Sequence, residues 1–143
     1  EKDLCRAVDF GHSFSPILEM RSLSSPVNPS TRQPVDEVTV LSHGQAVTLD
    51  IILSCIIAER RGLIDHKIVG QVIDCARNCG LAVYHPLFAD AALVWESLQD
   101  TVKHRNGNQN LPLPVGIGNC AFINNLSYDE LTNAIEIFKT LKT

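Results

Sequence analysis

The sequence predicts a mainly α-helical fold, a single domain over residues 1–143 with one small Pro/Gly-rich hairpin before the last helix. Apolar residues recur at helical spacing in three segments, and a fourth segment, residues 45–61, is apolar on nearly every side. Pro and Gly residues cluster between residues 106 and 125, as in a hairpin with tight turns. A length of 143 residues, 45% of them hydrophobic, suits one packed core.

The first helix is expected to begin at Ser15. Ser15 followed by Pro16 matches an N-cap and the favoured first position of a helix, and the helix should run to Leu23. Residues 24–39 contain three prolines and no apolar periodicity, which predicts an exposed loop. A loop of this length is typical of an insertion or of a functional segment.

Four further helices follow this loop. The helix over residues 45–61 has no polar stripe, so we expect it to be the buried centre of the domain. The next helix ends before Gly80, the residue type favoured just beyond a helix, and another covers residues 91–102. Ser127 and Glu130 form the pattern of a capping box at the start of the last helix.

Composition excludes several classes of partner. The formal charge of −4 offers no attraction to nucleic acid or to an anionic membrane surface. The longest apolar stretch, residues 51–58, is followed by three charged residues and is too short to cross a bilayer. The five cysteines lack the spacing of a zinc site, which predicts reduced, buried thiols in a cytoplasmic protein. Because the chain begins at Glu1 rather than at Met, we expect it to be part of a longer polypeptide.

Two of the five histidines stand out as candidate metal ligands. His12 and His43 each adjoin a glycine near the start of a predicted helix, and close backbone approach is expected at Gly11 and Gly44. Two neutral imidazoles can bind a divalent cation, but a catalytic zinc normally has three protein ligands. Spacing alone therefore favours two structurally satisfied histidines over a metal site.

Two segments resemble the metal-binding motifs of the 3-dehydroquinate synthase superfamily, the sugar phosphate cyclases. They are DFGHSFSPILE, residues 9–19, and HGQAV, residues 43–47. The resemblance extends over the whole chain, as the helical C-terminal domain and one half of these two-domain enzymes. It implies that His12 and His43 bind zinc, or cobalt, and that an upstream glutamate is the third ligand. The domain that binds NAD would also precede this chain.

Three positions depart from the 3-dehydroquinate synthases. Pro16 stands where those enzymes have a second histidine, Asp9 where they have asparagine, and Asp50 where they have a small residue. These residues resemble the branch that cyclises sedoheptulose 7-phosphate, typified by the 2-epi-5-epi-valiolone synthases and desmethyl-4-deoxygadusol synthases. Pro16 also leaves the carbonyl of His12 without a helical partner. Gln45 replaces a glutamate of the second motif.

The resemblance implies a cyclase of the carbon–oxygen lyase type. NAD transiently oxidises a ring hydroxyl, phosphate is eliminated, the ketone is reduced again, and the opened sugar closes by an aldol step. Asp9 and Asp50 are expected to contact or orient the sugar, and one of Lys103, His104 and Arg105 to hold the phosphate. The alternatives are a turn-forming role for Asp9, a place at the interface with the absent domain for Asp50, and the helix dipole for the three basic residues.

Two other functions stay open at this point. One is 3-dehydroquinate synthase, which Pro16 disfavours, and the other is an inactive helical binding or structural fragment. The expected partner is a small-molecule sugar phosphate, with no nucleic acid and no membrane, and the whole enzyme is a candidate homodimer. The isolated chain lacks the third ligand and the nucleotide-binding domain, so we expect it to be inactive alone.

Overall fold

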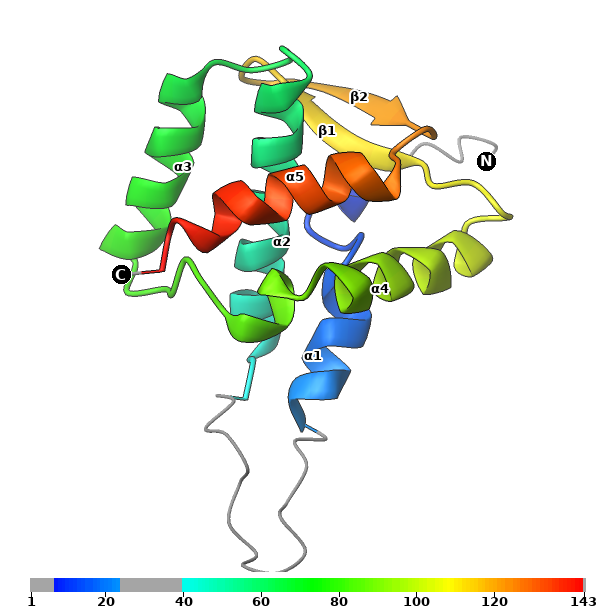
Figure 1. The fold of residues 1–143 in the computed structure, drawn as a ribbon. Coiled ribbons are helices and arrows are strands. Elements are labelled where there is room, and N and C mark those ends of the chain that lie inside the picture. The colour runs from blue at the N-terminus through cyan, green and yellow to red at the C-terminus, as the bar shows by residue number, and fades with distance from the viewer. Residues whose placement is uncertain (1–6, 24–39, 143) are drawn as a thin grey trace, which may run out of the picture.

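A computed structural model describes residues 7–23 and 40–142 as a helical domain with one two-stranded antiparallel sheet (Figure 1). The elements in chain order are η1 (Ala7–Asp9), α1 (Ser15–Leu23), α2 (His43–Arg60), α3 (His66–Asn78), η2 (Pro86–Ala89), α4 (Ala91–His104), β1 (Leu111–Val115), β2 (Asn119–Ile123) and α5 (Tyr128–Lys139). The predicted loop over residues 24–39, like Cys5, lies outside the described residues. Within the described ranges, none of the helices combines the length and the apolar character that a membrane span needs.

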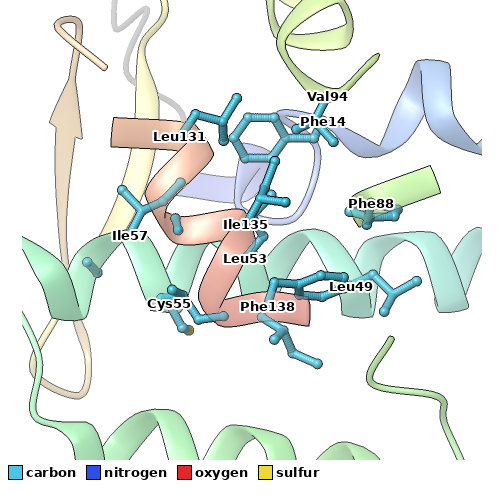
Figure 2. Packing of buried hydrophobic residues seen from close by; sticks show 14 of the residues in the cluster. Phe14, Leu49, Leu53, Cys55, Ile57, Phe88, Val94, Leu131, Ile135 and Phe138 are labelled. Atoms are coloured by element: carbon cyan, nitrogen blue, oxygen red, sulfur yellow. The ribbon is translucent and has the colours of Figure 1, made fainter. Parts of the chain in front are cut away.

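Helix α2 is the centre of the domain, as its apolar sequence predicted. Helices α1, α3 and α5 and strand β1 all pack against it (Figure 1). Leu49, Leu53 and Ile57 of α2 are fully buried, and α5 crosses them with its apolar face (Figure 2). Phe138 of α5 lies against Phe88 of η2, with ring centroids 6.3 Å apart. Burial of this kind, at roughly 1.5–3 kcal/mol for a large apolar side chain, is the main stabilising term of the fold.

The starts of α2 and α5 show which capping residues form hydrogen bonds in the structure. Ser42 caps α2 by accepting a hydrogen bond from the Gln45 amide at 3.2 Å, so the helix begins two residues before the predicted start. Ser127 caps α5 in the same way through the amide of Glu130. Only this half of the predicted capping box is confirmed, because the Glu130 carboxylate instead accepts two hydrogen bonds from the guanidinium of Arg61.

The predicted hairpin is present and contributes to the core. β1 and β2 pair in antiparallel register from Leu111 with Ile123 to Val115 with Asn119. Leu111 and Leu113 of β1 are fully buried, while β2 lies on the outer side. The amide of Gly116 in the turn donates to the carbonyl of Leu63 at 3.0 Å, which ties the hairpin to the connection between α2 and α3.

The cysteines only partly follow the prediction of buried thiols. Cys55 of α2 is buried, and burial raises the pKa of its thiol to about 12. Cys75, Cys79 and Cys120 are exposed, so the prediction is wrong for these three. All four are free thiols in the part of the chain that the structure describes.

Candidate metal and substrate site

The side chains of His12 and His43 come together although they are far apart in the sequence. His12 lies in the turn between η1 and α1, and His43 is the first residue of α2. Their ring centroids are 5.5 Å apart and the ring planes are inclined by 47°. Two imidazoles at this separation can bind one small cation between them. The role of His12 and His43 as metal ligands stays a prediction.

Gly11 allows the turn that carries His12 to approach α2 closely. Its φ of +83° lies in the left-handed region, and a Cβ atom there would come within 2.8 Å of Val47 and 3.0 Å of Ile51. The predicted close approach is therefore confirmed at Gly11. It is wrong at Gly44, where a Cβ atom would meet no atom within 4 Å.

The carboxylate of Asp50, in α2, binds the backbone at the start of α1. Its carboxylate accepts hydrogen bonds from the amides of Phe14 at 2.7 Å and Ser15 at 2.8 Å. Asp50 therefore satisfies free N–H groups at the helix start, while Ser15, expected to be the cap, is the first helical residue and donates its hydroxyl to the Gly11 carbonyl. Burial raises the pKa of Asp50 to about 6, whereas the hydrogen bonds from Phe14 and Ser15 and the nearby His12 act to lower it.

The burial of Asp50 bears on the roles that the sequence left open for this residue. The residue is 0% exposed in this chain alone, covered by the residues that follow His12. A direct contact with a sugar hydroxyl does not fit such a position, and neither does a place at the interface with another domain. The remaining predicted role, orientation of a metal ligand, fits, because Asp50 fixes the backbone just after His12.

Arg105 supplies the partner that the His12 carbonyl lacks within α1. Its guanidinium donates to that carbonyl at 3.3 Å and to the carbonyls of Gln109 and Asn110 at 2.9 and 3.2 Å. Burial lowers the pKa of Arg105, and the carboxylates of Asp9 and Asp50 act in the opposite direction. Arg105 thus links the segment before the hairpin to the turn that carries His12.

A cavity of about 440 Å³ opens beside His12. Asp9, Pro16, Asp100, His104 and Arg105 are among the residues that line it. Of the predicted substrate contacts, the structure therefore gathers Asp9, His104 and Arg105 around one cavity. Lys103 is exposed and is not part of this lining, and His104 also lies 3.7 Å from the carboxylate of Asp100.

The hydrogen bonds of the two imidazoles determine which ring nitrogens are free. Nδ1 of His12 lies 3.3 Å from the carbonyl of Phe10, and Nδ1 of His43 lies 3.0 Å from Oε2 of Glu19. Carbonyl and carboxylate oxygens only accept, so in the neutral rings the proton must be on Nδ1 in both cases. Each Nε2 then keeps its lone pair, which is the arrangement typical of metal-bound histidines.

These residues fit part of a zinc site. Zinc binds neutral imidazole nitrogen well, and both candidate nitrogens carry a free lone pair. No group of three His, Cys, Asp or Glu side chains able to hold a metal occurs within residues 7–23 and 40–142. A complete zinc site therefore needs at least one donor from elsewhere, as the resemblance implies.

Two polar contacts could not be read from the sequence. Glu19 is the last residue of the first motif, and its carboxylate contacts the ring of His43. Gln45 donates to the Ala82 carbonyl at 2.8 Å and accepts from the Ala82 amide at 3.2 Å, so its amide clamps the segment between α3 and η2. An ionised glutamate at this position could accept from the Ala82 amide but could not donate to the Ala82 carbonyl.

Comparisons with curated proteins identify relatives over almost the entire chain. No protein-family model matches it. It is 40% identical over 141 residues to a 2-epi-5-epi-valiolone synthase of Actinomyces sp., a match that covers 99% of this chain and 33% of the relative. It is 32% identical over 143 residues to the demethyl-4-deoxygadusol synthase of Trichormus variabilis, a match that covers 100% of this chain and 31% of that relative.

One solved structure gives the same picture. ValA, a 2-epi-5-epi-valiolone synthase of Streptomyces hygroscopicus subsp. jinggangensis 5008 with NAD+ and Zn2+ bound, superposes with a TM-score of 0.82 at 40% identity. The match covers 98% of this chain and 34% of ValA, in its C-terminal part. The resemblance to the sugar phosphate cyclases and the fold class are thus confirmed. The chain spans about a third of its relatives rather than the predicted half.

Proposed function

We propose that this chain is the metal- and substrate-binding part of a zinc- and NAD-dependent cyclase that converts sedoheptulose 7-phosphate to a cyclitol with loss of phosphate. The observation that carries the proposal is the meeting of His12 and His43, with ring centroids 5.5 Å apart and each Nδ1 next to an oxygen acceptor, together with the cavity of about 440 Å³ that opens beside His12. The relatives named above support the reaction type. The third metal ligand and most of the NAD site would lie in the rest of the protein.

His12 and His43 would hold the metal, which would polarise a sugar oxygen, while NAD would accept and return the hydride. Asp9 stands at the cavity next to His12, where its carboxylate can accept hydrogen bonds from sugar hydroxyls. Asp50 acts through the backbone, because it fixes the residues that follow His12. This division gives the two acids different tasks, orientation of the substrate and orientation of the ligand.

The phosphate is assigned to the side of the cavity lined by His104 and Arg105. Arg105 uses three hydrogen bonds on backbone carbonyls, and its five N–H donors leave two for an anion. His104 is the more exposed candidate, and its Nε2 lies 3.7 Å from the carboxylate of Asp100. Lys103 is the weakest of the three predicted phosphate contacts, because it does not line the cavity.

The alternative, 3-dehydroquinate synthase, is disfavoured by the side chain at position 16. Pro16 lines the cavity where that enzyme has a histidine, and proline can neither accept nor donate a proton there. Classification as a lyase, a cytoplasmic location and assembly into a homodimer stay predictions that accompany the proposal. An inactive fragment is the second alternative, and activity of a chimeric enzyme that contains this chain would exclude it.

A chimera of ValA tests the proposal, with this chain in place of the matching third of that enzyme. We expect the chimera to bind zinc and to form a cyclised product from sedoheptulose 7-phosphate but not from the substrate of 3-dehydroquinate synthase. His12→Ala and His43→Ala should each abolish turnover and bound zinc, measured by product analysis and elemental analysis. His66→Ala, on the exposed start of α3, is the matched control and should change neither.

Two results would contradict the proposal. The first is a chimera that is folded and binds NAD but forms no product from sedoheptulose 7-phosphate. The second is a His12→Ala or His43→Ala variant that retains both its zinc and its turnover. Circular dichroism and NAD binding would separate these outcomes from a simple failure to fold.

A further inference from the structure

We propose that Glu19 is a positioning residue for the metal site, which holds His43 in the Nδ1–H tautomer and so keeps its Nε2 free for a divalent cation. The inference rests on the proposed function for the identity of the cation, but its structural part can be tested without any metal. Glu19 is the last residue of the first motif, residues 9–19.

The contact itself determines the position of the proton on His43. Oε2 of Glu19 lies 3.0 Å from Nδ1 of His43, and an ionised carboxylate can only accept a hydrogen bond. The proton of the neutral ring must therefore be on Nδ1. A carboxylate partner also makes the opposite nitrogen more basic, which strengthens it as a metal ligand.

Glu19 is held in place by the structure around it. Its neighbour Leu18 is fully buried, so α1 cannot rotate without exposing an apolar side chain. The hydroxyl of Ser22 donates to the Glu19 carbonyl at 2.7 Å and accepts from the amide of Leu41 at 2.9 Å. The buried Ser22 thus ties the turn that contains Glu19 to the residues that lead into His43.

The two histidines differ in the acceptor that each uses. His12 has a backbone carbonyl, that of Phe10, which no substitution removes without changing the turn. His43 depends on a side chain from another helix, and its own side chain is 66% exposed, so packing alone does not fix the ring. The orientation of His43 is therefore expected to be sensitive to Glu19, and that of His12 is not.

A second carboxylate–histidine pair in the same chain provides a matched control. Oε1 of Glu59 lies 2.6 Å from Nδ1 of His66, near the other end of α2. This pair has the same chemistry, but its histidine is not the one that meets His12. Removing Glu59 should therefore change the tautomer of His66 and nothing at His43.

The experiment measures tautomers in the 143-residue chain by long-range ¹H–¹⁵N NMR at pH 8.5, where free imidazole is neutral. We expect His43 to be the Nδ1–H form in the wild-type chain and to lose this preference in Glu19→Ala, with Glu59→Ala unchanged at His43. Glu19→Gln, which can still accept through Oε1, should retain most of it. Titration with Zn2+ followed at the two Nε2 resonances should then show affinity weaker by about 10- to 100-fold in Glu19→Ala.

The outcomes separate this inference from the proposed function. A Glu19→Ala chain that keeps the Nδ1–H tautomer of His43 and its zinc affinity would overturn the role of Glu19 and leave the metal site standing. If His12→Ala and His43→Ala instead bound zinc as well as the wild type, the proposed metal site would fail, whatever the tautomer of His43. Suppose that Glu19→Ala loses both the Nδ1–H preference of His43 and the zinc affinity, while Glu59→Ala keeps both. This result supports the role of Glu19 and also the proposed metal site.

Discussion

At the scale of single residues, the two glycines beside the candidate ligands have different roles. Gly11 has a left-handed φ of +83° and no space for a Cβ atom, whereas Gly44 lies in the first turn of α2 with open space around it. Ala at position 11 would meet Val47 and would also adopt a backbone conformation that L-residues avoid. The same sequence feature, a glycine next to a histidine, therefore has a structural cause in only one case.

We expect Gly11→Ala to lower the free energy of unfolding by roughly 2 kcal/mol or more, because strain and overlap add. Gly44→Ala should leave stability unchanged or raise it by up to about 1 kcal/mol, because Ala is the better helix former. Urea denaturation of both variants and the wild-type chain measures this difference. Equal destabilisation by the two substitutions would show that the close contact with α2 is not the reason why position 11 requires glycine.

Residue-scale contacts over long sequence separations account for what the sequence could not reveal. Gln45 contacts the backbone of Ala82, and Arg105 contacts that of His12. No local pattern marks such a pair, since each depends on how distant helices pack. The convergence of His12 and His43 is also long-range, but it could be anticipated because both residues belong to motifs of a known family.

At the scale of secondary-structure elements, local signals predicted most helices and the hairpin. Apolar patterns and end signals identified the four long helices, with bounds that differ by one or two residues, a usual uncertainty at helix ends. At the start of two helices one predicted local contact was wrong, although Ser127 caps α5 as predicted. Asp50 rather than Ser15 satisfies the amides at the start of α1, and Glu130 contacts Arg61 rather than completing its box. In both cases a tertiary partner replaced the local one.

The role of Asp50 at the start of α1 predicts a dependence of stability on pH. Burial raises its pKa from 3.8 to about 6, so the folded chain holds this proton more tightly than the unfolded chain. The resulting stabilisation is complete below pH 4 and is lost as the pH rises through about 6. The loss amounts to at most roughly 3 kcal/mol, at about 1.4 kcal/mol per pKa unit.

Asp50→Asn tests this dependence, because the amide has no proton to lose and can still accept from Phe14 and Ser15. Unfolding free energies of the wild type and the variant are measured from pH 4 to pH 7.5 with a chelator present. The unfolding free energy of the wild type should fall relative to that of Asp50→Asn as the pH rises to about 6, and the difference should stay constant above that pH. A difference that does not vary with pH would contradict the raised pKa.

At the scale of the whole molecule, the chain provides a folded domain but only part of the proposed metal centre. Its core is continuous from α1 to α5, so the 103 residues from 40 to 142 and the α1 segment have an apolar interior of their own. The part of the chain that the structure describes offers two imidazole donors and no third ligand beside them. Folding and metal affinity should therefore be separable properties.

We expect the isolated chain to fold cooperatively, to bind zinc only weakly and to show no turnover of sedoheptulose 7-phosphate. Two nitrogen donors leave zinc short of its usual four ligands, and most of the NAD site is expected elsewhere. Thermal unfolding, isothermal titration with Zn2+ and product analysis give the three results. Tight uptake of one zinc per chain would contradict this prediction and would place a complete site within these residues.

The contacts between α1 and α2 also determine how the site responds to a change in the length of the segment that joins the two helices. Asp50 anchors one end of α1, Ser22 anchors the other, and Gly11 seats the intervening turn against α2. The relative placement of the two imidazoles is thus set by direct contacts between the helices and not by the length of the polypeptide that joins them. An insertion or a deletion between positions 24 and 39 should therefore leave the two imidazole rings in the same relative position.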